Sequence, residues 1–236
     1  MKQFGLPGRF LPCALLIACS GIGFWNEALA KKPLPEVSPE GLQLQKSKDV
    51  RVFYLRPGAS FAKYDRVAIL DTDVEFAEKW QRDYNANTGG LQARVTTRDM
   101  ERMKAAIADE FKKVFTQELQ KGAGYQVVQT AEPEVLVLRP AIVDVEVTVP
   151  DLQTADARRT LARSAGQMTL YLELWDSESK TILARIMDPQ EHESTAGLGR
   201  LMNRGTNKAA LDEMLREWAV KLRKHLDAAR ATSGRK

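Results

Sequence analysis

Acidic and aromatic side chains alternate with apolar ones in three stretches of this chain, residues 66–76, 135–149 and 166–175. Each stretch is rich in the β-branched and aromatic residues that favour strands. Successive side chains of a strand point to opposite faces of its sheet, so the polar residues of each stretch share one face. The residues of this predicted acidic-aromatic face are Asp71, Asp73, Glu75, Asp144, Glu146, Tyr171, Glu173 and Trp175.

Carboxylates beside flat aromatic rings suit the binding of a sugar, a cationic peptide or a divalent cation. Paired carboxylates can also hydrolyse glycosides when they lie roughly 5–10 Å apart. Asp71, Asp73, Asp144 and Glu146 are the candidates for such a carboxylate-based enzyme or cation site. The solvated face of an antiparallel sheet shows the same alternation without any function, and it is the favoured interpretation. The acidic-aromatic face is therefore a candidate ligand-binding surface.

Other catalytic chemistry has little support in the sequence. Ser164 lacks the flanking glycines of a nucleophile elbow. The chain has only two histidines, His192 and His225, and the run Glu191-His192-Glu193 needs a further metal ligand from elsewhere. The glycines at 197, 199 and 205 have neither the spacing nor the lysine of a phosphate-binding loop. We predict no catalytic residue, no metal ligand and no cofactor, and a protein more suited to binding than to catalysis.

A second cluster of aromatic and polar residues lies in 79–85, which we expect to be a loop. Trp80, Arg82 and Tyr84 form its core. Two interpretations stay open. These residues contact a partner, or the segment caps the edge of the sheet with Trp80 and Tyr84 buried.

Residues 1–30 have the pattern of a signal peptide. Lys2 and Arg9 precede an apolar run, and Ala28-Leu29-Ala30 supplies the small residues that signal peptidase requires. Cleavage near Ala30 would place the mature chain in the periplasm. A competing cut is the lipobox-like run Leu16-Ile17-Ala18-Cys19, which would make the chain an outer-membrane lipoprotein lipidated at Cys19.

Cysteine content and charge limit the classes of partner. Both cysteines, Cys13 and Cys19, precede Ala30, so a chain cut there has no thiol for a disulfide or a metal. The formal net charge is only +4. Export removes the chain from nucleic acid, and we expect membrane contact only through lipid on Cys19. The expected partner is another envelope protein or a cell-wall component.

The rest of the chain is expected to form a linker at 31–48, one α+β domain at 49–230 and a basic tail at 231–236. The linker has three prolines and no hydrophobic periodicity. In each predicted helix apolar residues recur at intervals of three and four, and Thr96 or Thr97 can cap the first. Predicted strands cover 50–55, 66–76, 125–130, 135–149, 166–175 and 181–187, and predicted helices cover 97–121 and 207–229.

These elements favour a mostly antiparallel sheet with both helices packed on one face. The last two strands form a hairpin around the polar turn at 176–180. The order strand 66–76, helix 97–121, strand 125–130 allows a crossover that would add one parallel pair.

Several separate motifs resemble one family. They include Ser38-Pro-Glu-Gly-Leu42, Leu55-Arg-Pro-Gly-Ala59, Lys79-Trp-Gln-Arg-Asp-Tyr-Asn85, Val137-Leu-Arg-Pro-Ala-Ile142, Ser164-Ala-Gly-Gln-Met-Thr-Leu-Tyr-Leu-Glu-Leu174 and Asn203-Arg-Gly-Thr-Asn-Lys208. From about residue 38 to 228 the chain resembles the bacterial envelope family known as domain of unknown function 3313. The resemblance implies an exported protein, often a lipoprotein, with no assigned activity and no catalytic residues to carry over. The Ala28-Leu29-Ala30 cut departs from that lipoprotein pattern.

Taken together, the sequence predicts an exported envelope protein of uncharacterised activity that binds a partner or assists envelope assembly without catalysis. The alternative is the carboxylate-based enzyme or divalent-cation-binding protein that uses the acidic-aromatic face.

Overall fold

The computed structural model describes residues 33–88, 94–130, 132–148, 160–162, 164–193, 200–202 and 204–233. The chain divides into two units, and residues 36–236 form the one that contains the sheet and the helices. Only residues 33–35 of the other unit are described, and they have no regular secondary structure. The predicted signal peptide and Cys19 lie outside the described residues. Among the described helices, none combines the length and apolarity needed to cross a membrane.

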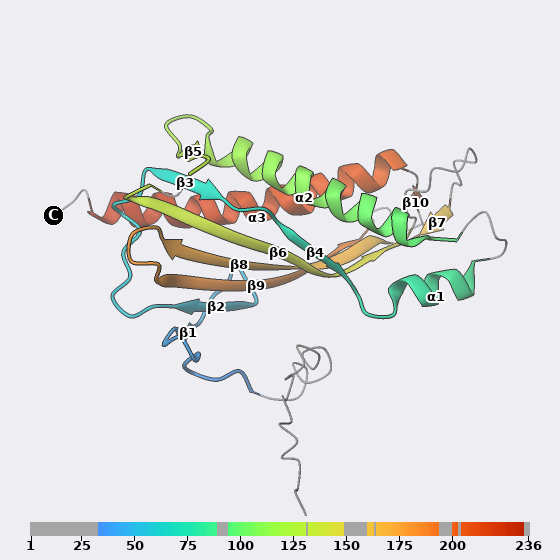
Figure 1. Ribbon diagram of the computed structural model, residues 1–236, viewed down its shortest axis with the longest axis horizontal. Coiled ribbons are helices and arrows are strands. Elements are labelled where there is room, and N and C mark those ends of the chain that lie inside the picture. Colours follow the sequence, from blue (N-terminus) through green and yellow to red (C-terminus); the bar gives the residue numbers. More distant parts are fainter. Residues whose placement is uncertain are drawn as a thin grey trace, which may run out of the picture. The chain divides into compact units, whose positions relative to one another are not determined.

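Eight strands form one mixed sheet in the described part of the chain (Figure 1). Its order is β1, β2, β9, β8, β6, β3, β5, and β4 pairs with β6 beyond the end of β3. The strands are β1 (Gln43–Gln45), β2 (Val52–Leu55), β3 (Arg66–Ile69), β4 (Asp73–Phe76), β5 (Gln126–Val128), β6 (Val135–Val147), β8 (Ser164–Asp176) and β9 (Ile182–Glu193). Two further strands, β7 (Thr160–Ala162) and β10 (Arg200–Met202), pair with each other.

The neighbours from β1 to β6 pair antiparallel, whereas β3 and β4 run parallel to β6. The fold class predicted from sequence, a mostly antiparallel α+β domain, is confirmed. The β8–β9 hairpin forms around the expected turn. The expected parallel pair also forms, because β3 and β5 lie side by side in parallel.

Two long helices, α2 (Thr97–Leu119) and α3 (Arg204–Ser233), lie next to each other on one side of the sheet (Figure 1). A shorter helix, α1 (Trp80–Asn87), follows β4. The apolar stripes of α2 and α3 meet the inward-facing side chains of β6 and β8 in one core. Fully or almost fully buried members of that core include Phe111, Phe115, Leu136, Leu138, Leu172, Leu215 and Trp218.

The stretch 66–76, expected to be one strand, is divided into β3 and β4. β3 pairs with β6 as far as Leu138, and β4 begins to pair at Ala141. Between these positions β6 carries Pro140, which has no N–H to donate to a neighbouring strand. The interruption therefore coincides with the one residue of this part of β6 that has no N–H, although Pro140 stays paired with Leu172 of β8 on the other side.

Residues 36–45, which lie within the expected linker, are folded against the sheet. Gln43–Gln45 form β1, and Leu42 is completely buried. A strand of this length is too short to show an alternating pattern, and the nearby prolines suggested a linker. At the other end, the expected basic tail begins inside α3, while residues 234–236 lie outside the described residues.

Thr96 caps α2. Its side chain accepts a hydrogen bond from the Asp99 N–H (3.2 Å), and its own N–H donates to the Asp99 carboxylate (2.8 Å). We expect Thr96→Ala to lower the free energy of unfolding by about 1 kcal/mol, as loss of a helix cap generally does. Thr97→Ala is the matched control, and its effect should be no more than about 0.5 kcal/mol. Urea denaturation measures both, and equal losses would contradict the assignment of the cap to Thr96.

Candidate functional site

The structure spreads the predicted acidic residues over different environments. Asp71 lies between β3 and β4 and is fully exposed, with its carboxylate 3.7 Å from Lys112 Nζ. Asp73, Glu75 and Glu146 are also exposed, whereas Asp144 is half-buried. Asp144 has a φ of 54° at the point where the register between β6 and β8 shifts. A shifted register re-aims side chains, so simple alternation along β6 does not extend past this point.

The register across the sheet brings part of the predicted face together. Asp73 is opposite Ala141 of β6, and Ala141 is opposite Tyr171 of β8. Asp73 and Tyr171 therefore share a row with one strand between them. Neighbouring strands lie about 5 Å apart, so the two backbones are separated by about 10 Å. In the next rows Glu173 lies between two arginines, Arg139 of β6 and Arg185 of β9.

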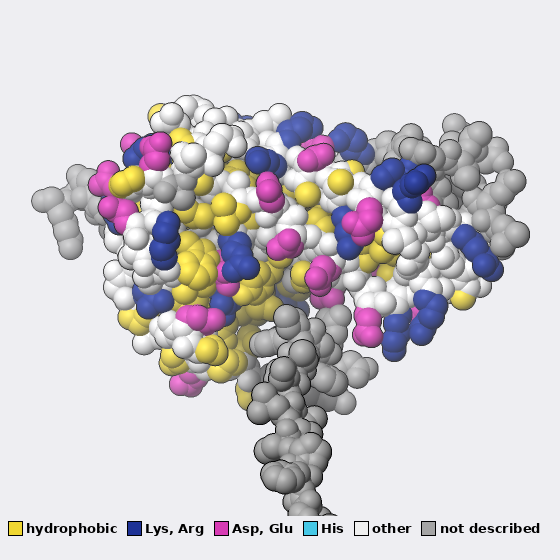
Figure 2. All heavy atoms as spheres, viewed as in Figure 1, with side chains coloured by type: hydrophobic (Ala, Val, Ile, Leu, Met, Phe, Trp, Pro, Cys, Tyr) yellow, Lys and Arg dark blue, Asp and Glu magenta, His cyan; other side chains and the backbone are white. Residues whose placement is uncertain are grey.

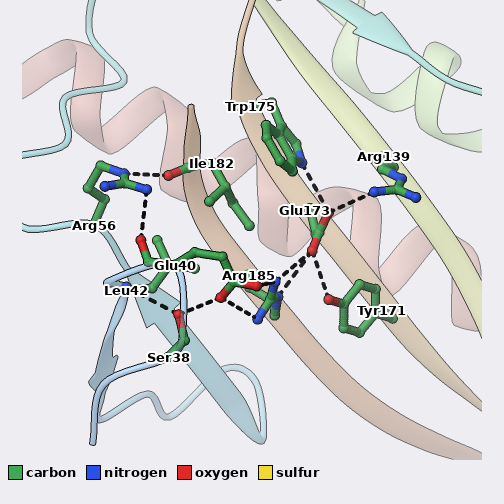
Figure 3. Close-up of polar contacts among 10 residues, drawn as sticks. All are labelled: Ser38, Glu40, Leu42, Arg56, Arg139, Tyr171, Glu173, Trp175, Ile182 and Arg185. Carbon is green, nitrogen blue, oxygen red and sulfur yellow. Dashed lines mark hydrogen bonds and ion pairs between the residues drawn. The ribbon is translucent and has the colours of Figure 1, made fainter. Parts of the chain in front are cut away.

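Glu173 is the centre of a buried polar network (Figure 3). Tyr171 Oη donates to Glu173 Oε1 at 2.8 Å, and Trp175 Nε1 donates to Oε2 at 3.1 Å. Arg185 Nη2 lies 2.9 Å from Oε1, and Arg139 Nη1 lies 3.6 Å from Oε2. Burial together with the hydrogen bond to Glu173 raises the pKa of Tyr171 above its ordinary value. The three residues predicted on β8 thus bond to each other, and basic side chains that the sequence prediction left out balance the carboxylate.

Arg185 also reaches the N-terminal segment 36–45. Its guanidinium contacts both carboxylate oxygens of Glu40, at 3.0 and 3.2 Å, and Ser38 Oγ donates to the same carboxylate at 2.8 Å. Hydrogen bonds from Arg185 and Ser38 lower the pKa of Glu40 to about 2 from the ordinary 4.5. The folded pKa is the lower one, so this pair stabilises the segment fully above pH 4.5 and loses its effect as the pH falls toward 2.

This face of the sheet is therefore mixed in charge rather than acidic. In Figure 2 hydrophobic side chains gather over the left-hand part of the sheet, and acidic and basic side chains are interspersed among them. Glu173 binds donors through both oxygens, so its role in the structure is to hold Tyr171, Trp175 and Arg185 in place. Among the described residues, no group of three or more potential ligands is placed to hold a metal ion.

The segment 79–85, expected to be a loop, begins at the N-cap Lys79 and otherwise lies in helix α1. Trp80 stacks between Phe76 and Tyr84, with ring centroids 4.8 and 5.6 Å away. Asn85 joins α1 to Val95, two residues before α2. Its side chain donates to Val95 O at 2.9 Å and accepts from Val95 N–H at 2.7 Å. α1 has eight residues and only Trp80 and Tyr84 as large apolar side chains, which is too few to reveal a helical period in the sequence.

The two interpretations of this segment can now be compared. Trp80 and Tyr84 are half-buried and pack against the small cluster of Val95, Met100 and Met103. Arg82 is exposed and pairs with Asp83 at 2.8 Å. The two rings stabilise the junction between β4, α1 and α2, and Arg82 is left as the surface residue of the set.

A cavity of about 440 Å³ lies between the C-terminal half of α3 and the sheet. Its walls are apolar side chains of β2, β8, β9 and α3, and the segment 46–50 borders its opening. The apolar lining residues are Val50, Phe53, Leu55, Phe61, Leu170, Leu172, Leu174, Ala184, Ile186, Trp218, Leu222 and Leu226. The apolar lining residues of α3 belong to the apolar stripe of the predicted helix 207–229, and such a stripe looks the same beside a packed interior and beside an open cavity.

Charged side chains surround the opening of the cavity. They are Lys46, Lys48, Asp49, Lys221 and His225. His225 Nε2 lies 2.8 Å from the Asp49 carboxylate, which fastens the segment 46–50 to α3. Lys221 lies 2.8 Å from Glu217 and 3.6 Å from Asp188.

Comparison with family models matches residues 37–218 to one described as a protein of unknown function, DUF3313. The chain belongs to the DUF3313 family. The resemblance noted in the sequence is thereby confirmed, and the matched range includes β1, the Glu173 network and most of the cavity lining. Comparison with curated proteins finds no match.

Solved structures similar to this DUF3313 chain are distant. A PelC dodecamer from Paraburkholderia phytofirmans is 14% identical, with 68% of this chain and 91% of that chain covered and a TM-score of 0.32. Protein XCC0632 from Xanthomonas campestris, of family DUF330, is 12% identical, with 77% and 94% covered and a TM-score of 0.41. A putative neuraminyllactose-binding hemagglutinin homolog from Helicobacter pylori is 10% identical, with 75% and 93% covered and a TM-score of 0.37. None of these similarities is close enough to assign a ligand or an assembly to the DUF3313 chain.

The Glu173 network gives a direct test of its role. The Glu173 side chain is 6% exposed, and Glu173→Ala leaves Arg185, Tyr171 and Trp175 without a buried partner. We expect the free energy of unfolding to fall by about 3 kcal/mol, as when one member of a buried ion pair is removed. Arg139→Ala is the control, because Arg139 is 61% exposed, and its loss should cost no more than about 1 kcal/mol. Similar urea midpoints for the two variants would show that the network does not stabilise the sheet.

Proposed function

We propose that this chain is an exported, non-enzymatic protein of the bacterial envelope that binds an apolar ligand in the cavity between α3 and the sheet. The observation that supports binding at this place is the cavity itself, with its volume of about 440 Å³ and its apolar walls. Cavities of roughly 300–1,000 Å³ lined mainly by apolar side chains are typical of small-molecule sites.

Packing makes the cavity unusual for a structural core. Protein interiors are close-packed, and a void leaves the side chains around it without van der Waals partners on one side. Leu172, Ala184 and Trp218 are almost completely buried and yet border the cavity. An apolar ligand would supply the missing contacts to these side chains.

The polar surface offers less support for a carboxylate-based reaction. Glu173 is bonded to two neutral donors and is flanked by Arg139 and Arg185. A general acid or base must lie within hydrogen-bond reach of the substrate, and both oxygens of Glu173 are already bonded to side chains of the protein. Asp73, Glu75 and Glu146 stay candidates for surface contacts with a partner, but nothing in their surroundings concentrates them into a site.

Export is the part of this proposal that the sequence alone supports. We expect the full chain, produced in a bacterium with its own N-terminus, to be recovered from the periplasm with a mass that begins at Lys31. A lipid on Cys19 would keep the protein in the envelope but move it to the membrane. Recovery in the cytoplasm with Met1 in place would contradict export. Intact-mass spectrometry of each cell fraction separates these outcomes.

Binding in the cavity is tested with an uncharged apolar fluorophore, N-phenyl-naphthylamine. Ile186 lines the cavity and is half-buried, so Ile186→Phe would place a ring in the space that the ligand needs. We expect this variant to bind the fluorophore about tenfold more weakly, which corresponds to a loss of about 1.4 kcal/mol.

Leu211→Phe is the matched control, because Leu211 is a half-buried apolar residue that does not line the cavity. Its affinity for the fluorophore should equal that of the unaltered protein. Failure of the unaltered protein to bind the fluorophore, or equal loss in both variants, would contradict ligand binding at this place.

A further inference from the structure

The opening of the cavity has an excess of positive charge. Five ionisable residues line it: the basic residues Lys46, Lys48, Lys221 and His225, and one acidic residue, Asp49. His225 is paired with Asp49, and Lys221 is paired with Glu217. Lys46 and Lys48 are exposed, and neither lies within ion-pair distance of a carboxylate in the described part of the chain. Two positive charges are therefore available at the rim.

The segment that carries these two lysines has a defined conformation. Ser47 Oγ accepts hydrogen bonds from the N–H groups of Asp49 and Val50, both at 3.2 Å, so the backbone turns at Lys48, directly after Lys46 and Ser47. The next residue, Arg51, donates its N–H to the buried carboxylate of Asp188 at 2.9 Å. Asp49 holds the same segment to α3 through His225. The two ammonium groups thus start from an anchored turn beside the opening.

We propose that the ligand is a single-chain amphiphile with an anionic head group, with its apolar tail in the cavity and its head at Lys46 and Lys48. This inference rests on the proposed function, since it names the ligand class of the same site. The interior offers only apolar walls, and a charge placed there would lose its hydration without compensation, so the head must stay at the rim. An anion at the rim meets the two unpaired lysines, whereas a cation would meet repulsion from them.

Competition against the uncharged fluorophore isolates the contribution of the head group. Dodecanoate and dodecyltrimethylammonium have the same tail and opposite charge, and monododecanoylglycerol supplies a neutral head. The full chain is purified without detergent and each competitor is used below its micelle concentration. We expect dodecanoate to displace the fluorophore at a concentration at least about tenfold lower than dodecyltrimethylammonium requires, with the neutral compound between them.

Charge reversal assigns that preference to two residues. Lys46→Glu with Lys48→Glu should weaken dodecanoate binding about tenfold, leave the fluorophore affinity unchanged and improve binding of the cationic competitor. Lys79→Glu with Lys180→Glu is the matched control, because both lysines are exposed and neither lines the cavity. That control variant should keep the preference of the unaltered protein.

The outcomes separate this inference from the proposal on which it rests. Equal displacement by the three competitors, or an equal loss in the control variant, would overturn the anionic ligand while leaving apolar binding in place. Absence of fluorophore binding to the unaltered protein would overturn both. Organic extraction of the protein purified from cells provides an independent readout: a single-chain anionic lipid in the extract supports the inference, and a neutral or cationic lipid in its place contradicts it.

Discussion

The position of α3 over the sheet depends on one buried carboxylate, Asp188 of β9. It accepts hydrogen bonds from the indole N–H of Trp218 on α3 and from the backbone N–H of Arg51, both at 2.9 Å. Lys221 of α3 lies 3.6 Å away and supplies a positive charge. A buried carboxylate is tolerated only when such partners surround it, so the contact fixes the distance between helix and strand. The Trp218 ring that this contact holds in place forms part of the wall of the cavity.

On both sides of the sheet, buried carboxylates are paired with basic side chains. On the face with Tyr171 and Trp175, the carboxylate of Glu173 is compensated inside the fold by Arg185 and Arg139. On the helix side, Glu110 and Glu118 of α2 are likewise paired with basic residues of α2 and α3. Lys46 and Lys48 differ from these groups because no described carboxylate compensates them. Both lysines are exposed to solvent, so they need no partner for stability, and their distinguishing property is their place beside an apolar cavity.

Sequence patterns predicted the parts of the fold that obey a single period. The stripe from Met100 to Leu119 gave α2 almost to the residue, and alternation around the turn at 176–180 gave the β8–β9 hairpin. The prediction differs from the structure where another interaction outweighs the periodic pattern of apolar residues. The stretch 66–76 is divided into β3 and β4 beside Pro140 of β6. Asn85 stabilises a helix with too few apolar residues to show a period, and β1 is too short to alternate.

The Glu173 network and the cavity could not be predicted from the sequence for a different reason. Alternation correctly placed Tyr171, Glu173 and Trp175 on one face. It does not show which strands lie beside β8, however, and only the register of β6 and β9 makes Arg139 and Arg185 neighbours of Glu173. The cavity is even harder to predict, because its walls combine segments that are distant in sequence. An apolar residue has the same pattern whether its neighbour fills the space beside it or leaves that space open.

Residues 36–51 connect the two sides of the sheet. Glu40 pairs with Arg185 on the face of the Glu173 network, and a few residues later Asp49 pairs with His225 of α3 at the opening of the cavity. β1 lies between these contacts and holds the segment to the edge of the sheet through β2. Because one short stretch of chain takes part in both contacts, it joins the Glu173 network to the turn that carries Lys46 and Lys48. Residues 36–51 therefore contribute both to the Glu173 network and to the border of the cavity.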